Sequence, residues 1–166
     1  MNAVPQPQTA LRFRAAQRGD GAALWQLVKA AGTLELNSAY FYLLFAEHFG
    51  ATCLIAEQNG VLVGGVIAYR PPTETDAVFV WQIGVAPAAR GQGLGRQLLH
   101  ELLQLPGCKD VRWLLATVAE DNLASQRLFH GFARARGVNC ETQAFFSSDL
   151  FPESHTAEPL LRIGPL

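Results

Sequence analysis

The sequence has few charged residues, and neither sign dominates. Charged residues make up 16% of the 166 positions, and the formal net charge is −1. No block of Lys and Arg is present that would neutralise a phosphate backbone, so the composition argues against binding to nucleic acid. Hydrophobic residues make up 49%, which indicates a folded chain with a substantial core rather than a disordered one.

Long apolar runs and cysteine pairs are also missing. No run reaches the roughly 18 residues that a transmembrane helix needs, and residues 1–10 lack the basic-then-apolar order of a signal peptide. We therefore expect a cytoplasmic protein with a flexible tail over residues 1–10 and a single domain over residues 11–166. Cys53, Cys108 and Cys140 are odd in number and widely spaced, which favours free thiols over a disulfide framework or a metal site.

Periodicity and turn residues predict seven strands and four helices in the order βααβββαβαββ. Strands are expected over residues 11–14, 52–57, 61–69, 77–85, 111–118, 138–146 and 160–163, and helices over residues 19–31, 38–49, 93–105 and 122–133. Asp20 and Ser38 are expected to cap the first two helices, and Asn59-Gly60 to form a hairpin turn. This order is typical of an α/β sandwich with a mixed, mostly antiparallel sheet flanked by helices.

The stretch from Val85 to Gly95 is the most informative. It reads Val-Ala-Pro-Ala-Ala-Arg-Gly-Gln-Gly-Leu-Gly, between an apolar strand and a Leu-striped helix. Its glycines allow the backbone to turn tightly beside a ligand, and the N-terminus of the next helix offers free N–H groups that suit a diphosphate. It lacks the third glycine of a dinucleotide fingerprint and the Gly-Lys-Ser/Thr of a P-loop. Taken alone, it fits a plain strand-to-helix turn equally well.

Two elements together resemble the GNAT N-acetyltransferases. Arg90, Gly93 and Gly95 match the Arg/Gln-x-x-Gly-x-Gly/Ala signature of that family, and residues 122–129 resemble its second element, after the next strand. The resemblance implies the GNAT fold, with acetyl-CoA as co-substrate and no metal. The cofactor-binding residues that it implies are Ile83, Gly84 and Val85 along the pantetheine arm, Arg90, Gly91, Gln92, Gly93, Leu94 and Gly95 at the diphosphate, and Asn122, Ser125 and Phe129 beyond.

The second element places Asn122 at the start of a predicted helix and Phe129 within it. Asn122 fits an N-cap of its helix as well as a contact to the pantetheine arm. GNAT enzymes often carry Tyr at the position of Phe129, as the general acid for the departing thiolate. Phe129 has no hydroxyl and cannot donate a proton, so the thiolate leaves unassisted or takes its proton from elsewhere.

Three further segments resemble the diaminobutyrate acetyltransferases, which make N4-acetyl-2,4-diaminobutyrate for ectoine synthesis. They are residues 32–40, 79–83 and 151–158, within a resemblance that spans residues 11–166. It implies 2,4-diaminobutyrate as the acceptor, a homodimer, and a role in osmoadaptation. Two departures concern the acceptor side: Glu35 stands where Asp is expected, and Ala119-Glu120 replaces Thr-Pro.

A diamino acid carries two ammonium groups and a carboxylate, so its site needs acidic or carbonyl partners. The candidate substrate-binding residues are Glu35, Asn37, Ser38, Tyr40, Tyr42, Trp81 and Glu153. Solvated surface positions would account for the carboxylates about as well as a substrate site does. Ordinary core positions would likewise account for the aromatic side chains.

The acceptor must also lose a proton. An alkyl ammonium has a pKa of about 10.4, so a carboxylate or His must take that proton before the amine attacks. The candidates are Glu35, Glu120, His155 and Glu158, which the sequence does not rank.

Two other functions stay open at this point. One is a GNAT enzyme for a different acceptor, such as a polyamine, an antibiotic or a protein N-terminus. The other is a module that binds acetyl-CoA without catalysis. Turnover with a panel of amines separates all three.

Overall fold

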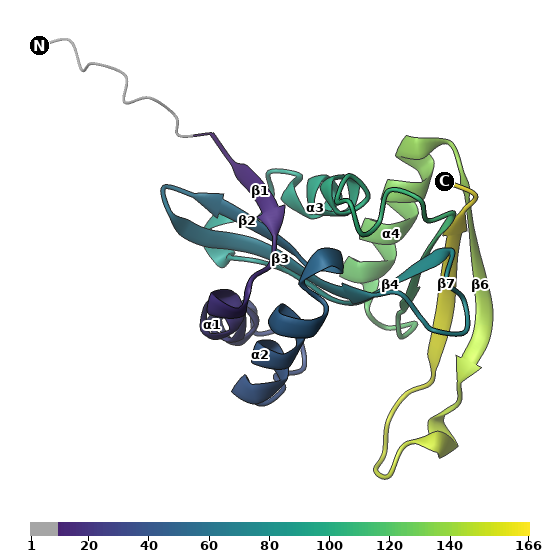
Figure 1. Ribbon diagram of the computed structural model, residues 1–166. Coiled ribbons are helices and arrows are strands. Elements are labelled where there is room, and N and C mark those ends of the chain that lie inside the picture. Colours follow the sequence, from purple (N-terminus) through teal and green to yellow (C-terminus); the bar gives the residue numbers. More distant parts are fainter. Residues whose placement is uncertain (1–9) are drawn as a thin grey trace, which may run out of the picture.

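The computed structural model describes residues 10–166 and contains the eleven predicted elements in the predicted order (Figure 1). The strands are β1 (Arg12–Ala15), β2 (Leu54–Gln58), β3 (Val61–Tyr69), β4 (Ala77–Val85), β5 (Trp113–Thr117), β6 (Asn139–Phe146) and β7 (Glu158–Gly164). The helices are α1 (Gly21–Ala31), α2 (Ala39–His48), α3 (Leu94–Leu102) and α4 (Leu123–Arg136). Of the predicted tail, residues 1–9 lie outside the described residues.

The strands form one sheet in the order β1-β2-β3-β4-β5-β7-β6. Every neighbouring pair is antiparallel except β4 and β5, which are parallel. The prediction of a mixed, mostly antiparallel sheet is therefore confirmed. The predicted hairpin is confirmed too, because Asn59 and Gly60 have φ angles of 55° and 74°, in the left-handed region that a two-residue hairpin turn uses.

Two helices cover each face of the sheet (Figure 1). On one face, α1 buries Leu24 and Val28 against Ile55 and Ile67 of β2 and β3. On the other face, the buried leucines of α3 pack with α4 and the sheet in the larger core cluster. Helix α3 ends at Leu102, three residues before the predicted end, and α4 runs three residues past its predicted end to Arg136.

Strands β4 and β5 stay paired over only three residue pairs: Ala77 with Trp113, Val78 with Leu114, and Phe79 with Leu115. Beyond Phe79, β4 continues to Val85 with β3 as its strand partner on one side. The other edge of this stretch has no strand partner among the described residues. Backbone N–H and C=O groups need hydrogen-bond partners, so this edge of β4 is available to a ligand.

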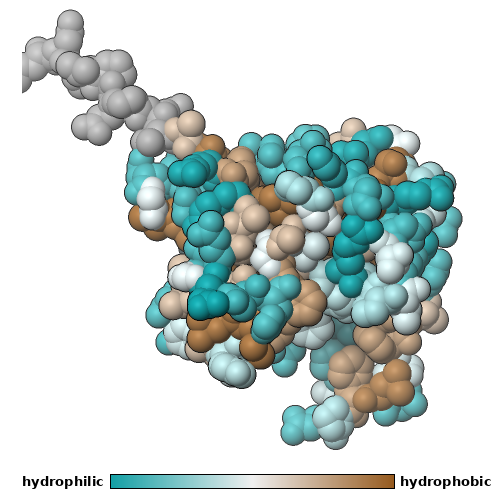
Figure 2. All heavy atoms as spheres, in the orientation of Figure 1, coloured by the Kyte–Doolittle hydropathy of each residue, from teal (hydrophilic) through white to brown (hydrophobic). Residues whose placement is uncertain are grey.

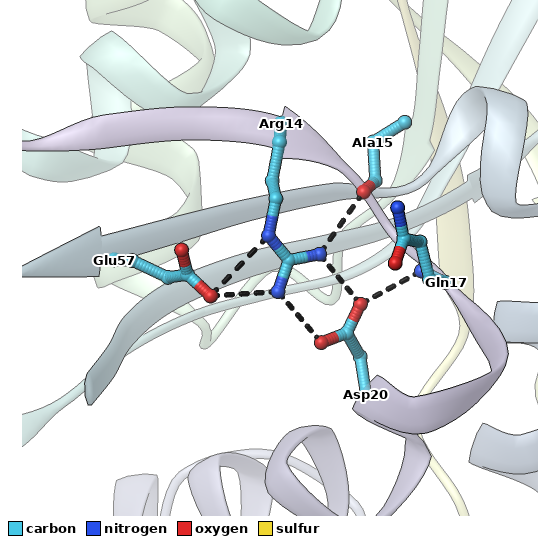
Figure 3. Close-up of polar contacts among 5 residues, drawn as sticks. All are labelled: Arg14, Ala15, Gln17, Asp20 and Glu57. Carbon is cyan, nitrogen blue, oxygen red and sulfur yellow. Dashed lines mark hydrogen bonds and ion pairs between the residues drawn. The ribbon is translucent and has the colours of Figure 1, made fainter. Parts of the chain in front are cut away.

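The side chain of Asp20 does not cap α1, which corrects the sequence prediction. Its carboxylate instead accepts hydrogen bonds of 2.7 and 2.8 Å from Arg14 of β1 and one of 2.7 Å from the backbone N–H of Gln17 (Figure 3). Arg14 also donates to Glu57 of β2, at 2.6 Å. The carboxylate and the guanidinium form charge-assisted hydrogen bonds through both Asp20 oxygens, so the carboxylate joins β1 to the turn before α1.

This ion pair makes stability depend on pH. The hydrogen bond from Arg14 is the main reason that the pKa of Asp20 lies below its ordinary value. A carboxyl group with a lowered folded-state pKa stabilises the fold above its unfolded pKa and loses that effect as pH falls through the folded value. We expect Asp20→Asn to cost roughly 1 kcal/mol at pH 7, a drop in Tm of about 2–4 °C. Calorimetry should show the difference shrinking toward pH 3.

Glu47→Gln is the matched control for this prediction. Glu47 pairs with Arg18 at 2.7 Å, but on the open surface, where the side chain of Arg18 is 78% exposed. Exposed pairs contribute little to stability, so Glu47→Gln should leave Tm almost unchanged. An equal drop in Tm for both substitutions, or a drop for Asp20→Asn that does not depend on pH, would contradict the stabilising role of the Asp20–Arg14 ion pair.

Candidate functional site

Two glycines shape the loop that joins β4 to α3. Gly91 and Gly93 have φ angles of 76° and 75°, and Gly93 is the N-cap of α3. Such angles are strained for residues with a Cβ. A Cβ added at either glycine would meet no atom within 4 Å, so both positions face open space. The free N–H groups at the start of α3 lie beside this space, which makes it suitable for an anion.

A pocket of about 450 Å³ lies at this loop. Four arginines line it: Arg90, Arg96, Arg127 and Arg134. Of the predicted cofactor-binding residues, Val85, Arg90, Gly91, Gly93, Leu94 and Gly95 line the pocket, whereas Gln92 is exposed and does not. Guanidinium groups bind phosphate oxygens by charge-assisted hydrogen bonds, so the pocket is suited to a diphosphate.

Sequence reasoning missed three of these arginines. A signal was present in α4, where Arg127, Gly131 and Arg134 are spaced so that they share one helix face. Arg96 lies in the first turn of α3 and lines the same pocket. A second hollow of about 620 Å³ shares Gly93 and Arg96 with the first and is also lined by residues of α4.

The predicted Arg90 has a second contact. Its Nη2 donates a hydrogen bond of 2.7 Å to the carbonyl oxygen of Ala31, the last residue of α1. The bond satisfies one of the carbonyls that a helix leaves unpaired at its C-terminus. Arg90 therefore ties the β4–α3 loop to the start of the α1–α2 connection, while it also lines the pocket.

The remaining predicted cofactor residues lie along β4 and α4. Ile83 is half-buried and packs on the α3–α4 side of the sheet. On the opposite side, a Cβ at Gly84 would lie 3.4 Å from Leu34. The side chain of Asn122 accepts a hydrogen bond of 3.2 Å from the N–H of Ser125, so the predicted N-cap is confirmed. Phe129 is 3% exposed and belongs to the core.

A β-bulge shapes the middle of β4. Ile67 pairs with Gln82 and Ala68 with Val80, so Trp81 is an extra residue opposite β3. A bulge breaks the alternation of side chains between the two faces of a sheet. Trp81 is 47% exposed, with its ring centroid 6.2 Å from that of Phe41 in α2, and Gln82 contacts the α1–α2 connection as well.

The residues between 32 and 42 that are predicted to bind the diamine lie around this bulge. Glu35, Ser38 and Tyr40 are exposed, and Ser38 caps α2 by accepting a hydrogen bond from Phe41 N–H. Tyr42 has no exposed surface, and its hydroxyl donates to Gln82 at 3.1 Å. Tyr42 therefore supports the connection from behind rather than presenting a surface to a ligand.

Among the predicted bases, Glu158 has a pKa above its ordinary value. Burial is the main reason that its pKa lies above the ordinary value, and the charges of Asp121 and Glu35 raise it further. His155 and a hydrogen bond with Thr117 oppose the shift. Glu35, His155 and Asp121 are therefore near enough for their charges to act on the carboxyl group of Glu158, and sequence reasoning missed Asp121.

The other acidic and imidazole candidates are more exposed. Glu120 and Glu153 are exposed and are not among the groups that shift the pKa of Glu158. His155 stacks on Phe151 with ring centroids 3.9 Å apart, and its Nδ1 lies 2.6 Å from the carbonyl oxygen of Thr156. Because a carbonyl only accepts, this contact requires the proton on Nδ1 and leaves Nε2 to accept.

Within residues 10–166, no helix is both long and apolar enough to cross a bilayer. The same residues contain no group of three or more His, Cys, Asp or Glu side chains that would hold a metal ion.

Comparisons with known proteins agree with this geometry. Residues 21–132 match the model of the acetyltransferase (GNAT) family. The L-2,4-diaminobutyric acid acetyltransferase of Shouchella clausii is 45% identical over 148 residues, which cover 89% of this chain and 83% of that protein. The enzyme of the same name from Bordetella parapertussis is 46% identical and covers 98% of this chain and 89% of its own length.

A solved structure gives the same result at the level of the fold. The diaminobutyrate acetyltransferase of Paenibacillus lautus, in complex with its substrate L-2,4-diaminobutyric acid and coenzyme A, superposes with a TM-score of 0.88. It is 37% identical, and the match covers 95% of this chain and 96% of that one.

Proposed function

Because the chain belongs to the acetyltransferase (GNAT) family, and within it to the L-2,4-diaminobutyric acid acetyltransferases, we infer that it acetylates L-2,4-diaminobutyrate on the side-chain (N4) amine. One observation carries the proposal. An arginine-lined pocket at the end of β4 and a carboxyl group of raised pKa beside the end of β5 flank the place where these strands separate. This arrangement supports an acetyl donor bound on one side of that gap and a proton acceptor on the other.

Acetyl-CoA supplies the acetyl group as an activated thioester. Around the diphosphate, we assign the backbone of Gly91 and Gly93 together with the arginines of the 450 Å³ pocket. The unpaired edge of β4 from Ile83 to Val85 offers backbone hydrogen bonds to the pantetheine arm. The 620 Å³ hollow, which adjoins the first pocket, suits the adenosine end.

The acceptor fits the other side of β4. Glu35 offers a carboxylate to an ammonium group, and Asn37 offers an amide to the carboxylate. Tyr40 and Trp81 are 68% and 47% exposed, and they provide aromatic surface for a short aliphatic chain or a cation. Ser38 and Glu153 remain outer members of the proposed set.

Glu158 is the proposed general base. A carboxylate with a raised pKa takes a proton from an ammonium group more readily than an ordinary one. Glu158 accepts one proton from the N4 ammonium group, and the neutral amine attacks the acetyl carbon. The N–C bond forms, the C–S bond breaks, and the second proton leaves the nitrogen to solvent. Phe129 has no proton to give, so the departing thiolate takes its proton from solvent.

The proposal is tested by product analysis. Purified protein is incubated with acetyl-CoA and, separately, with 2,4-diaminobutyrate, ornithine, a polyamine and a peptide. Thiol release should be fastest with diaminobutyrate, and mass spectrometry with NMR should place the acetyl group on N4. Acetylation of the α-nitrogen or preference for another amine would overturn the substrate assignment. Absence of turnover with every amine would favour a module that only binds acetyl-CoA.

The role of Glu35 gives a quantitative prediction. Glu35→Gln keeps the shape of the side chain and removes the charge that faces the acceptor's ammonium group. Because a charged hydrogen bond contributes about 1.5 kcal/mol or more, kcat/KM for diaminobutyrate should fall roughly tenfold, with the Kd of acetyl-CoA unchanged. Glu141→Gln, an exposed change on β6, is the control. Unchanged kinetics for Glu35→Gln would mean that Glu35 is only a solvated surface residue.

We also propose that the protein is a homodimer that serves ectoine synthesis and osmoadaptation, as the family resemblance implies, and that it is cytoplasmic. The end of β6 and the segment that joins β6 to β7 project from the body of the molecule and expose apolar side chains (Figures 1 and 2). Phe145, Phe146 and Leu150 are 49%, 43% and 64% exposed, which suits a surface covered by a second copy. Light scattering should give about twice the 18.0 kDa mass of one chain.

A further inference from the structure

The carboxamide of Gln82 links two elements that are distant in sequence. Its Nε2 donates a hydrogen bond of 2.6 Å to the carbonyl oxygen of Glu35, and its Oε1 accepts one of 3.1 Å from the hydroxyl of Tyr42. That hydroxyl also accepts a hydrogen bond of 3.3 Å from the backbone N–H of Asn37. Three hydrogen bonds in series therefore hold the loop that contains Glu35 and Asn37 against β4 and α2.

Gln82 has this position because of the bulge in β4. In a regular strand, Trp81 and Gln82 would face opposite sides of the sheet. With Trp81 as the extra residue, Trp81 approaches Phe41 while Gln82 reaches Tyr42, so both face α2. Gln82 is only 7% exposed and is one of two buried polar residues among residues 10–166. It thus lies behind the acceptor site, out of reach of a ligand.

The loop held in this way ends in an unsatisfied donor. The Nδ2 of Asn37 is buried and has no hydrogen-bond partner within the described part of the chain. Buried polar atoms are nearly always hydrogen-bonded, so this donor suits a group that arrives with the acceptor, such as its carboxylate. Its distance from β4 is set by the same three hydrogen bonds.

We propose that Gln82 is a positioning residue that sets acceptor length, by fixing how far Glu35 and Asn37 lie from β4. The inference rests on the proposed function, because it takes the amine to be acetylated beside β4. A rigid spacing between the groups that hold the amino acid and the reacting centre favours one chain length. The site therefore discriminates 2,4-diaminobutyrate from ornithine, which is one methylene longer, and from 2,3-diaminopropionate, which is one shorter.

Gln82→Met tests the proposal, because Met has a similar volume and lacks both hydrogen-bonding groups. We expect KM for diaminobutyrate to rise about tenfold, in line with two buried groups left unpaired. The ratio of kcat/KM for diaminobutyrate over ornithine should fall by a similar factor, while the Kd of acetyl-CoA stays within twofold. Tyr42→Phe removes only the middle hydroxyl and should change KM and the ratio in the same direction, by about threefold.

Thr52→Val is the matched control, since the Thr52 hydroxyl donates a buried hydrogen bond of 2.7 Å to the carbonyl oxygen of Ala68, away from the loop. It should lower Tm without changing KM or the ratio. The proposal is overturned if Gln82→Met and Tyr42→Phe lower Tm but keep the wild-type ratio, as Thr52→Val does. If Gln82→Met does not fold, Tyr42→Phe decides alone. If wild-type protein prefers another diamine, the substrate assignment fails, and the same ratios with that diamine and its homologues decide the role of Gln82.

Discussion

Glu158→Gln should lower kcat by roughly 10²–10⁴-fold, the usual contribution of a general base. Gln has the same shape but cannot accept the proton of the ammonium group. The Kd of acetyl-CoA should stay unchanged, because Glu158 lies beside Thr117 of β5 and does not line the arginine pocket. Stopped-flow or steady-state thiol detection measures the rate, and calorimetry measures the affinity.

The pH profile of kcat/KM and the Tm of the variant distinguish loss of the general base from loss of folded structure. In the wild type, kcat/KM should rise as Glu158 loses its proton, and this acid limb should be absent in Glu158→Gln. The pKa of Glu158 is raised, so the folded state binds its proton more tightly, and the unfolding free energy falls as pH rises through that range. The variant should therefore be at least as stable as the wild type at pH 7, and Tm tests this.

Glu120→Gln is the comparison that decides between the bases. Glu120 is exposed in the turn after β5, and a large loss of kcat there, with Glu158→Gln fully active, would move the assignment to Glu120. If neither variant is slower, His155, whose Nδ1 contacts the carbonyl oxygen of Thr156, becomes the base to test by His155→Gln.

Gly93→Val should raise the Kd of acetyl-CoA by about 10- to 100-fold. The new side chain would occupy the open space at the N-cap of α3, where the proposed diphosphate contacts the backbone. Loss of one or two charge-assisted hydrogen bonds at about 1.5 kcal/mol each gives this range. Titration calorimetry on the folded variant provides the measurement.

Gly60→Val controls for backbone strain. Gly60 has a φ of 74°, against 75° for Gly93, and a Cβ there would also meet no atom within 4 Å. Both variants should lose about 1–2 kcal/mol of stability, because a side chain disfavours this conformation. Gly60→Val lies in the β2–β3 hairpin and should keep wild-type affinity. Equal affinities for the two variants would contradict the diphosphate site.

The element order was predictable because the local signals agree. The Asn59-Gly60 turn defines the hairpin between β2 and β3, and the predicted bounds of β3 and β4 are those of the structure. The β4–α3 loop was singled out because Arg90, Gly93 and Gly95 match the GNAT signature, whereas glycines before a helix fit a plain turn equally well when taken alone. Three of the pocket's arginines were not predictable, because arginines on a helix surface resemble any solvated face until the fold places them around a pocket.

Features that depend on distant partners were out of reach. The bulge at Trp81 is defined by the pairing of β4 with β3. The carboxylate of Asp20 binds Arg14 of β1 instead of capping α1. In α2, residues 40–45 are all aromatic or leucine, so no periodicity indicated that Tyr42 faces the core. The role of Gln82 was not predictable, because a single polar residue in an apolar strand does not indicate which distant loop its side chain will bind.

The short pairing between β4 and β5 also bears on the order of events. Glu35 lies in the loop held against β4, whereas Glu158 lies beside the end of β5, so the acceptor's partners come from the two sides of this junction. Three residue pairs join those strands, and beyond Phe79 one edge of β4 has no strand partner among the described residues. In the proposed arrangement, acetyl-CoA lies along this edge, between the two sets of acceptor partners. We therefore expect acetyl-CoA to bind before the diamine.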